Sequence, residues 1–316
     1  MLEEIHHFGV TVHEQRRSRD FYARALRLPW MAESVNSGER YDRIYELEEA
    51  VNRITWYQIG RGGMETLNLP RHPSRAAGAG DIRQPGFRYI AFRVDGFDDY
   101  IEHLSKAGLH ADVVETRDGL CARVQDPDGI HVLLFDTGRV ALAGHVSGLK
   151  EIGLVAARRD EYEQFFDTLG LWLLERDCDF LEELFGVSAP APLYGHVRLI
   201  SPHGIEDDSR EQSHCIKPAH SPRAAFSDIG IKHIAYSVGD AGEFYARGRE
   251  AGLTFLFEPV NVPGGSRITY FLDPEGNTFE AMQLNPAMRI AAHAAGALTQ
   301  ARISLFARAN GLLRTR

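Results

Sequence analysis

Four side chains of different chemistry occupy one repeated position in the chain. His7 opens the strand-like segment His-Phe-Gly-Val-Thr-Val, and Glu151 opens the similar segment Glu-Ile-Gly-Leu-Val-Ala, 144 residues further on. Tyr89 opens Tyr-Ile-Ala-Phe-Arg-Val, and His233 opens His-Ile-Ala-Tyr-Ser-Val, again 144 residues apart. Imidazole and carboxylate groups are common ligands of divalent metals. The residue at this position therefore indicates which copies of the repeat retain metal-binding chemistry.

The same spacing indicates that the chain contains four copies of one unit. In each half of the chain, the second opening segment follows the first by 82 residues. A turn motif also recurs, as Asp-Pro-Asp-Gly from Asp126 and as Asp-Pro-Glu-Gly from Asp273. An internal repeat constrains the whole architecture, whereas a single motif constrains only its own segment. We number the four copies as units one to four.

Each unit is predicted to contain a strand, a helix and three further strands. In the first unit, Phe8, Val10 and Val12 alternate with smaller or polar residues, which is the period of a half-buried strand. Apolar residues at helical spacing follow over 14–28. The Asp-Pro-x-Gly turns precede the last strands, as at 278–284 in unit four. One such curled sheet leaves a face open, so two units are expected to close around a cavity.

We therefore predict an α+β chain of two pseudo-symmetric halves with an extension. Residues 1–143 and 144–285 would each contain a pair of βαβββ units, and 286–316 would form a C-terminal helix. This extension carries five arginines and no acidic residue. Its apolar side is mostly alanine, which predicts low membrane affinity. We expect it to dock on the acidic body of the chain or on a second subunit.

Composition excludes several classes of protein. The net charge of −9 argues against a nucleic-acid partner, which usually requires a basic face. No apolar run approaches the ~20 residues of a membrane span, and the N-terminus lacks the pattern of a signal peptide. Cys121, Cys178 and Cys215 are scattered and form neither a zinc motif nor a disulfide framework. These features predict a cytoplasmic protein.

The βαβββ unit, the strand that opens with histidine and the ending Asp-Pro-x-Gly-Asn-x-x-Glu together resemble the vicinal oxygen chelate superfamily. That superfamily includes glyoxalase I, methylmalonyl-CoA epimerase, fosfomycin-resistance enzymes and extradiol ring-cleaving dioxygenases. The resemblance covers residues 4–285 and implies the vicinal oxygen chelate fold, with two half-barrel pairs. It also implies one divalent metal ion, held between two units by residues of their first and last strands.

The resemblance assigns two ligand positions to each unit. In units one to four these positions are His7 and Glu65, Tyr89 and Leu133, Glu151 and Glu206, and His233 and Glu280. Units three and four together would place three negative charges on one ion, and units one and two would supply only two ligands. Units one and four would supply two imidazoles and two carboxylates, a neutral set that suits iron, manganese, cobalt, nickel or zinc. We therefore expect these two units to pair.

One predicted chemistry is that of an Fe(II) dioxygenase. His7, His233 and Glu280 would form a facial triad with open positions for a catechol or hydroquinone and for O2. The chain resembles hydroquinone-type ring-cleaving dioxygenases in its length, its His-His pair and its Phe-Glu-Ala ending. That resemblance implies that His6 and Tyr270 support the reaction from beside the metal. A phenol such as Tyr270 can donate to a substrate oxygen as charge develops.

Glu65 and Lys232 depart from the dioxygenase pattern and favour a second chemistry. Glyoxalase I and the epimerases commonly carry a carboxylate or amide ligand at the position of Glu65. A His/Glu/His/Glu site suits a Lewis-acid metal while a carboxylate moves a proton at the adjacent carbon. A metal-free protein that binds a small molecule is the third alternative. The length of the chain and its arrangement of four units favour the dioxygenase, acting on a small aromatic substrate. A homodimer is compatible with the C-terminal extension.

Overall fold

The computed structural model describes most of the repeated region. It covers residues 2–60, 62–74, 81–82, 84–141, 143–156, 159–171, 173–176, 183–185, 195–199 and 225–286. Glu206 and residues 287–316, which contain nearly all of the predicted C-terminal helix, lie outside the described residues.

Each unit has the predicted order of a strand, a helix and further strands. Unit one contains β1 (Leu2–Thr11), α1 (Gln15–Arg19), a π-helical turn (Asp20–Ala25), β2 (Trp30–Ser37), α2 (Glu39–Tyr45), β3 (Val51–Ile59) and β4 (Gly62–Asn68). Unit two contains β5 (Gly86–Asp95), α3 (Phe97–Lys106), β6 (Asp112–Thr116), β7 (Gly119–Gln125) and β8 (His131–Asp136). The helix α2 is an addition that the repeat did not predict.

The second half repeats this order. Unit three contains β9 (His145–Ala156), α4 (Arg159–Leu169), β10 (Leu173–Arg176) and β11 (Gly195–Leu199). Unit four contains β12 (Gly230–Val238), α6 (Ala241–Glu250), β13 (Thr254–Phe255), β14 (Val260–Asn261), β15 (Arg267–Leu272) and β16 (Thr278–Gln283). None of the described helices has the length and apolar character needed to cross a membrane.

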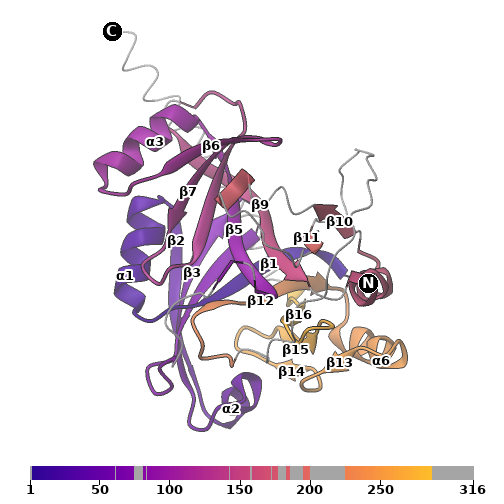
Figure 1. Ribbon diagram of the computed structural model, residues 1–316. Coiled ribbons are helices and arrows are strands. Elements are labelled where there is room, and N and C mark those ends of the chain that lie inside the picture. The colour runs from indigo at the N-terminus through magenta and orange to yellow at the C-terminus, as the bar shows by residue number, and fades with distance from the viewer. Residues whose placement is uncertain are drawn as a thin grey trace.

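The strands form two sheets, and each sheet combines units from opposite halves of the sequence (Figure 1). The larger sheet has the order β13-β15-β16-β12-β1-β4-β3-β2, with β14 paired to β15, so it joins units one and four. The smaller sheet has the order β10-β11-β9-β5-β8-β7-β6 and joins units two and three. The antiparallel pairing of β1 with β12 confirms the expected pairing of units one and four.

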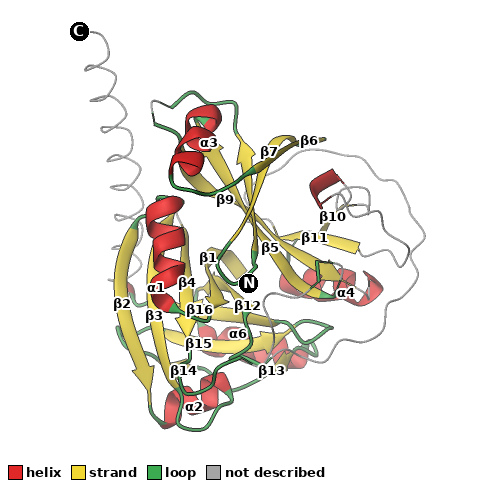
Figure 2. Cartoon of the chain, turned by 60° about the vertical axis from the view of Figure 1, so that its left-hand side comes forward, coloured by secondary structure: helices red, strands yellow, loops and turns green. Residues whose placement is uncertain are grey.

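The main core lies on the side of the sheets that the helices cover (Figure 2). Phe8 and Val10 of β1 pack there with Tyr22 of the π-helical turn and with Phe92 of the other sheet. Because side chains alternate along a strand, the other side of β1 carries His7, Gly9 and Thr11. The fold therefore directs the repeated ligand position away from the main core, onto the second face of each sheet.

Two equivalent contacts tie together the units within each half of the sequence. The Tyr22 hydroxyl donates to Asp126 at 2.9 Å, and the Tyr162 hydroxyl donates to Asp273 at 2.5 Å. Both aspartates begin the repeated turns and also accept backbone N–H groups of those turns. These two side-chain contacts lie within the predicted halves, whereas the hydrogen-bonded sheets cross the division at residue 143. The division into domains 1–143 and 144–285 stays a prediction.

Candidate metal centre

Strand register aligns the candidate ligands in two rows across four adjacent strands, β4, β1, β12 and β16. In one row, Gly9 of β1 pairs with Glu65 of β4 and with His233 of β12. In the other row, Ala235 of β12 pairs with His7 of β1 and with Glu280 of β16. Each row thus has a small residue between two functional ones, and the two rows are related by the pseudo-symmetry of units one and four.

Gly9 is small because the His233 ring lies against its backbone. A Cβ atom at Gly9 would meet the His233 Cε1 atom at 2.1 Å and Nδ1 at 2.6 Å. Carbon atoms in contact normally lie about 3.5–4.0 Å apart, so no side chain fits there without moving the imidazole. The glycine in His-Phe-Gly therefore fixes the position of a histidine that follows it by more than two hundred residues.

The four candidate side chains converge on one buried point. The two imidazole Nε2 atoms of His7 and His233 lie 3.1 Å apart. The Glu280 Oε2 atom lies 3.6 Å from the His7 nitrogen and 3.4 Å from the His233 nitrogen. The Glu65 Oε1 atom lies 3.3 Å from His233 Nε2 and 3.9 Å from His7 Nε2. All four residues are buried.

These separations fit a coordinated divalent ion. With metal–ligand bonds of about 2.1 Å, adjacent ligands lie roughly 3.0 Å apart in an octahedron and roughly 3.4 Å apart in a tetrahedron. His7, His233 and Glu280 form a group whose ligand atoms all lie within 4.8 Å of one another, and Glu65 contacts both imidazoles of that group. Two carboxylates and two neutral imidazoles would balance the charge of a divalent ion.

Burial and neighbouring charges shift the pKa values of His7 and His233 in opposite directions. Burial lowers the pKa of His7 well below its ordinary value, and the positive charges that His6 and His233 can carry lower it further. Burial also lowers the pKa of His233, but Glu65 and Glu280 outweigh this effect and raise it. A neutral imidazole is the form that binds a metal, so His7 is ready as a ligand at neutral pH.

The pKa of Glu280 is higher than that of a surface carboxylate. Burial raises its pKa to about 7, and the charge of Glu65 contributes to this rise. His233 and the Tyr270 hydroxyl act against it. The cluster thus concentrates negative charge that only a cation or a proton can compensate, as expected for a site that binds a positive ion.

His6 and Tyr270, both predicted from the sequence, lie beside this cluster. The Nδ1 atoms of His6 and His7 are 2.8 Å apart, so His6 contacts the ring nitrogen of His7 that faces away from Glu65 and Glu280. Groups in this position orient a metal-binding histidine and fix its tautomer. Tyr270 pairs with Glu280 across β15 and β16, and its ring stacks on His233 at 5.5 Å.

The structure also brings aromatic residues to the cluster that the repeat did not predict. Trp56 of β3 pairs with Glu65 and packs its ring against His7 at 5.2 Å. Phe226, just before β12, stacks on Tyr270 and on His233, and its ring also packs against Tyr45 of α2 at 4.9 Å. Tyr45 and Phe226 lie outside the repeated segments, so no internal comparison identifies them. An aromatic residue near a ligand strand is a weak signal on its own.

In the smaller sheet, the described residues at the equivalent positions include one candidate ligand, Glu151. There Ala91 pairs with Glu151 and with Leu133, as Ala235 pairs with His7 and Glu280. The Tyr89 hydroxyl donates to Glu151 Oε1 at 2.7 Å, and its ring covers Gly153 as His233 covers Gly9. Within the described residues, the larger sheet holds the sole His/Cys/Asp/Glu group of metal-binding geometry.

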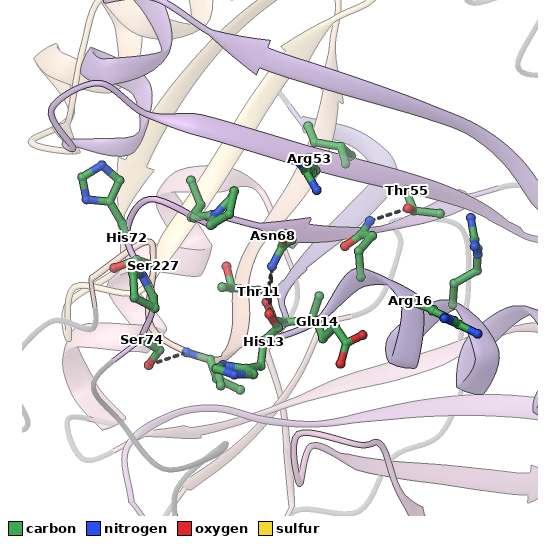
Figure 3. Close-up of a pocket in the computed structure, with 18 of the residues that line it drawn as sticks. Thr11, His13, Glu14, Arg16, Arg53, Thr55, Asn68, His72, Ser74 and Ser227 are labelled. Atoms are coloured by element: carbon green, nitrogen blue, oxygen red, sulfur yellow. Dashed lines mark hydrogen bonds between the residues drawn. The ribbon is translucent and has the colours of Figure 1, made fainter.

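A polar groove of about 590 Å³ opens near the end of β1, beyond the cluster (Figure 3). Its lining includes Thr11, His13, Arg16, Arg53 and Asn68, and none of the four candidate ligands. Thr11 follows Gly9 by two residues and donates to the Phe226 carbonyl at 2.9 Å. Phe226 and Thr11 thus lie between this groove and the buried cluster.

The fold and the family model agree. The model of the Glyoxalase/Bleomycin resistance protein/Dioxygenase superfamily matches residues 4–134 and 174–281, and the chain belongs to this superfamily. Its two sheets and flanking helices form the vicinal oxygen chelate fold, as predicted. Most members of the superfamily are metal-dependent enzymes that act on small molecules.

Solved structures with the same fold include enzymes of two chemistries. A proposed dioxygenase from Bacillus subtilis is 14% identical, with a TM-score of 0.58 over 90% of this chain and 86% of the other. Glyoxalase I from Zea mays is 14% identical, with a TM-score of 0.56 over 89% of this chain and 92% of the other. No curated protein sequence gives a significant match. At these identities the likeness supports the fold and not one reaction.

Proposed function

We propose that this protein is a metal-dependent isomerase or lyase that moves a proton at a carbon next to a carbonyl group. One divalent ion would be held by His7, Glu65, His233 and Glu280. The observation that carries this proposal is the Glu65 carboxylate, 3.3 Å from His233 Nε2 and 3.9 Å from His7 Nε2. With Glu65 as a fourth protein ligand, fewer positions are left for O2 and an organic substrate together, so the geometry supports this chemistry above ring cleavage.

A bound divalent ion would act as a Lewis acid that polarises the substrate carbonyl. Glu65 would take the proton from the neighbouring carbon, since its carboxylate is buried beside the cluster. The Tyr270 hydroxyl, on the strand next to Glu280, would donate to the oxygen on which negative charge develops. Trp56, Phe226 and Tyr45 surround the cluster with apolar surface, and they would exclude water from it.

Hydrogen exchange in D2O tests this chemistry without knowledge of the natural substrate. The protein would be loaded in turn with Zn, Co, Ni, Mn and Fe(II) and mixed without O2 with α-hydroxy ketones, hemithioacetals and branched acyl thioesters. NMR should show deuterium entering the carbon beside the carbonyl of at least one class. Glu65→Gln should lose this exchange by at least about 100-fold, the lower end of a general-base contribution. Glu151→Gln changes a buried carboxylate at the position that corresponds to His7 in the other sheet, and this variant should retain the exchange. Exchange that is unchanged in Glu65→Gln would contradict the proposal.

Ring cleavage by an Fe(II) dioxygenase is the second candidate, and two observations favour it. His7, His233 and Glu280 alone form a group with the donor set of a facial triad. His6 and Tyr270 lie beside that group, as the resemblance to hydroquinone-type dioxygenases implies. An oxygen electrode with Fe(II) protein and a panel of catechols and hydroquinones separates the candidates. Stoichiometric O2 uptake that persists in Glu65→Gln would establish ring cleavage in place of the isomerase reaction.

A further inference from the structure

The polar groove near the end of β1 carries more unpaired positive charge than negative charge. Three arginines and two glutamates line it (Figure 3). Arg19 pairs with Glu33, with 2.8 Å between Arg19 Nη1 and Glu33 Oε1. Among the described residues, the guanidinium groups of Arg16 and Arg53 make no ion pair or hydrogen bond, and neither does the Glu14 carboxylate. With histidines counted as neutral, the unpaired groups sum to one positive charge, in a chain whose net charge is −9.

Arg53 lies on the face of the larger sheet that is opposite to the metal ligands. Arg53, Thr55 and Tyr57 alternate onto one face of β3. Tyr57 packs in the main core, on the side that the helices cover. Trp56, on the other face, packs against His7. The sheet therefore separates a ligand that contacts Arg53 from the candidate metal centre.

Unit four has an arginine at the position equivalent to Arg53. Arg53 pairs with Asn68 at the end of β4. Arg267 pairs with Gln283 at the end of β16 in the same way. Helix α6 packs directly on this arginine, because a Cβ atom at Gly242 would lie 3.6 Å from Arg267 Nη1. Unit four thus places one guanidinium group beside a helix that has no side chain at that point.

Unit one has a second arginine in place of that glycine. The offset of 226 residues between the two candidate histidine ligands aligns Arg16 with Gly242. The same offset aligns Glu14 with Asp240, and both are N-cap residues. Unit one therefore supplies two guanidinium groups where unit four supplies one, and both line the groove. Like charges that share a groove repel each other, so an anion that contacts both stabilises the arrangement.

An exposed apolar side chain lies beside Arg53. Val35 of the edge strand β2 pairs with Arg53 and is 64% exposed. Leu69 and Pro70 line the same groove. Its volume of about 590 Å³ is that of a small-molecule site, which typically measures roughly 300–1,000 Å³. The lining therefore suits a ligand with one anionic end and an apolar body.

We propose that the groove is a second small-molecule site, which binds a small organic carboxylate through Arg16 and Arg53. A guanidinium group contacts the planar carboxylate with two parallel hydrogen bonds. One negative charge on the ligand compensates the single excess positive charge of the groove. Glu14 repels any further negative charge, so the site selects monocarboxylates over dicarboxylates. The apolar body of the ligand covers Val35, and the site acts independently of the proposed metal-dependent reaction.

Titrations followed by ligand NMR test this site with 4-bromobenzoate and 4-bromobenzamide, which have similar shapes and differ in charge. The wild type should bind the benzoate at least about tenfold more tightly, as expected for a hydrogen bond to a charged group. Arg53→Gln should remove this preference. Val35→Glu should also remove it, because the new carboxylate lies opposite Arg53, and the exposed position tolerates the change. Arg267→Gln is the matched control at the equivalent position of unit four, and it should retain the preference.

His7→Ala separates this site from the metal centre, and it should bind the benzoate like the wild type. A loss of the preference in His7→Ala would place the carboxylate on the metal and overturn the proposal. Equal affinity of the wild type for both probes, or a dissociation constant above about 10 mM for the benzoate, would overturn it as well. So would a preference that persists in Arg53→Gln or in Val35→Glu. In crystals soaked with 4-bromobenzoate, the anomalous peak of bromine should lie beside Val35, and a sole peak at the metal cluster would contradict the assignment.

Discussion

Replacing Gly9 with alanine should remove the metal without unfolding the protein. The new Cβ atom would meet His233 Cε1 at 2.1 Å. The imidazole must then move by about 1.4 Å to reach a normal carbon–carbon contact. Metal–ligand distances tolerate deviations of only about 0.2 Å, so the nitrogen of His233 would leave its position relative to His7, Glu65 and Glu280. We expect the affinity for Zn(II) or Co(II) to fall by at least about 100-fold.

Gly153→Ala provides a matched control for this prediction. Gly153 is the equivalent glycine of the smaller sheet, and a Cβ atom there would meet the Tyr89 ring at 2.1–2.4 Å. Neither glycine has a positive φ, so alanine adds no backbone strain at either position. Both variants should therefore lose about 1–3 kcal/mol of stability through overpacking. Isothermal titration of the metal-free proteins measures both affinities. Wild-type affinity in Gly9→Ala, or an equal loss in Gly153→Ala, would refute the reasoning.

Three further predictions concern pH, metal and the tail. Burial raises the pKa of Asp126 from 3.8 to about 6, so its folded form retains a proton that the unfolded chain loses between these values. The resulting stability is present at low pH and is lost as pH rises through 6, by up to about 3 kcal/mol. Denaturant unfolding at pH 4 and pH 7 should show this loss in the wild type relative to Asp126→Asn, and a constant difference between the two proteins would contradict it. Free Zn(II) at 100 times its dissociation constant should raise the unfolding free energy of the wild type by about 2.7 kcal/mol; an equal rise in His7→Ala would place the metal elsewhere. Deleting residues 286–316 should lower the unfolding temperature or dissociate a dimer while metal content is kept, and liposome binding that depends on this segment would contradict docking on protein.

The repeat made the ligand side of the site predictable. A constant offset of 144 residues relates His7 to Glu151 and Tyr89 to His233, so one alignment identified the position in all four units. The structure brings His7, Glu65, His233 and Glu280 together because β1 and β12 are neighbours in one sheet. The number of ligands and the charge balance favoured that pairing over the pairing of adjacent units.

The substrate side of the site was not predictable in the same way. Tyr45 lies on α2, a helix inserted between β2 and β3, and Phe226 precedes β12. Neither has a counterpart among the described residues of the other units, so their positions depend on packing that is specific to unit one and unit four.

An anomalous difference map from crystals soaked in Co(II) tests the metal centre most directly. We predict one strong peak per chain, at about 2.0–2.2 Å from the Nε2 atoms of His7 and His233 and from oxygens of Glu280 and Glu65. The same soak of His233→Ala crystals should give no peak at that position. A map without density between these four residues, or with its peak beside Tyr89 and Glu151 in the smaller sheet, would contradict a metal centre formed by units one and four.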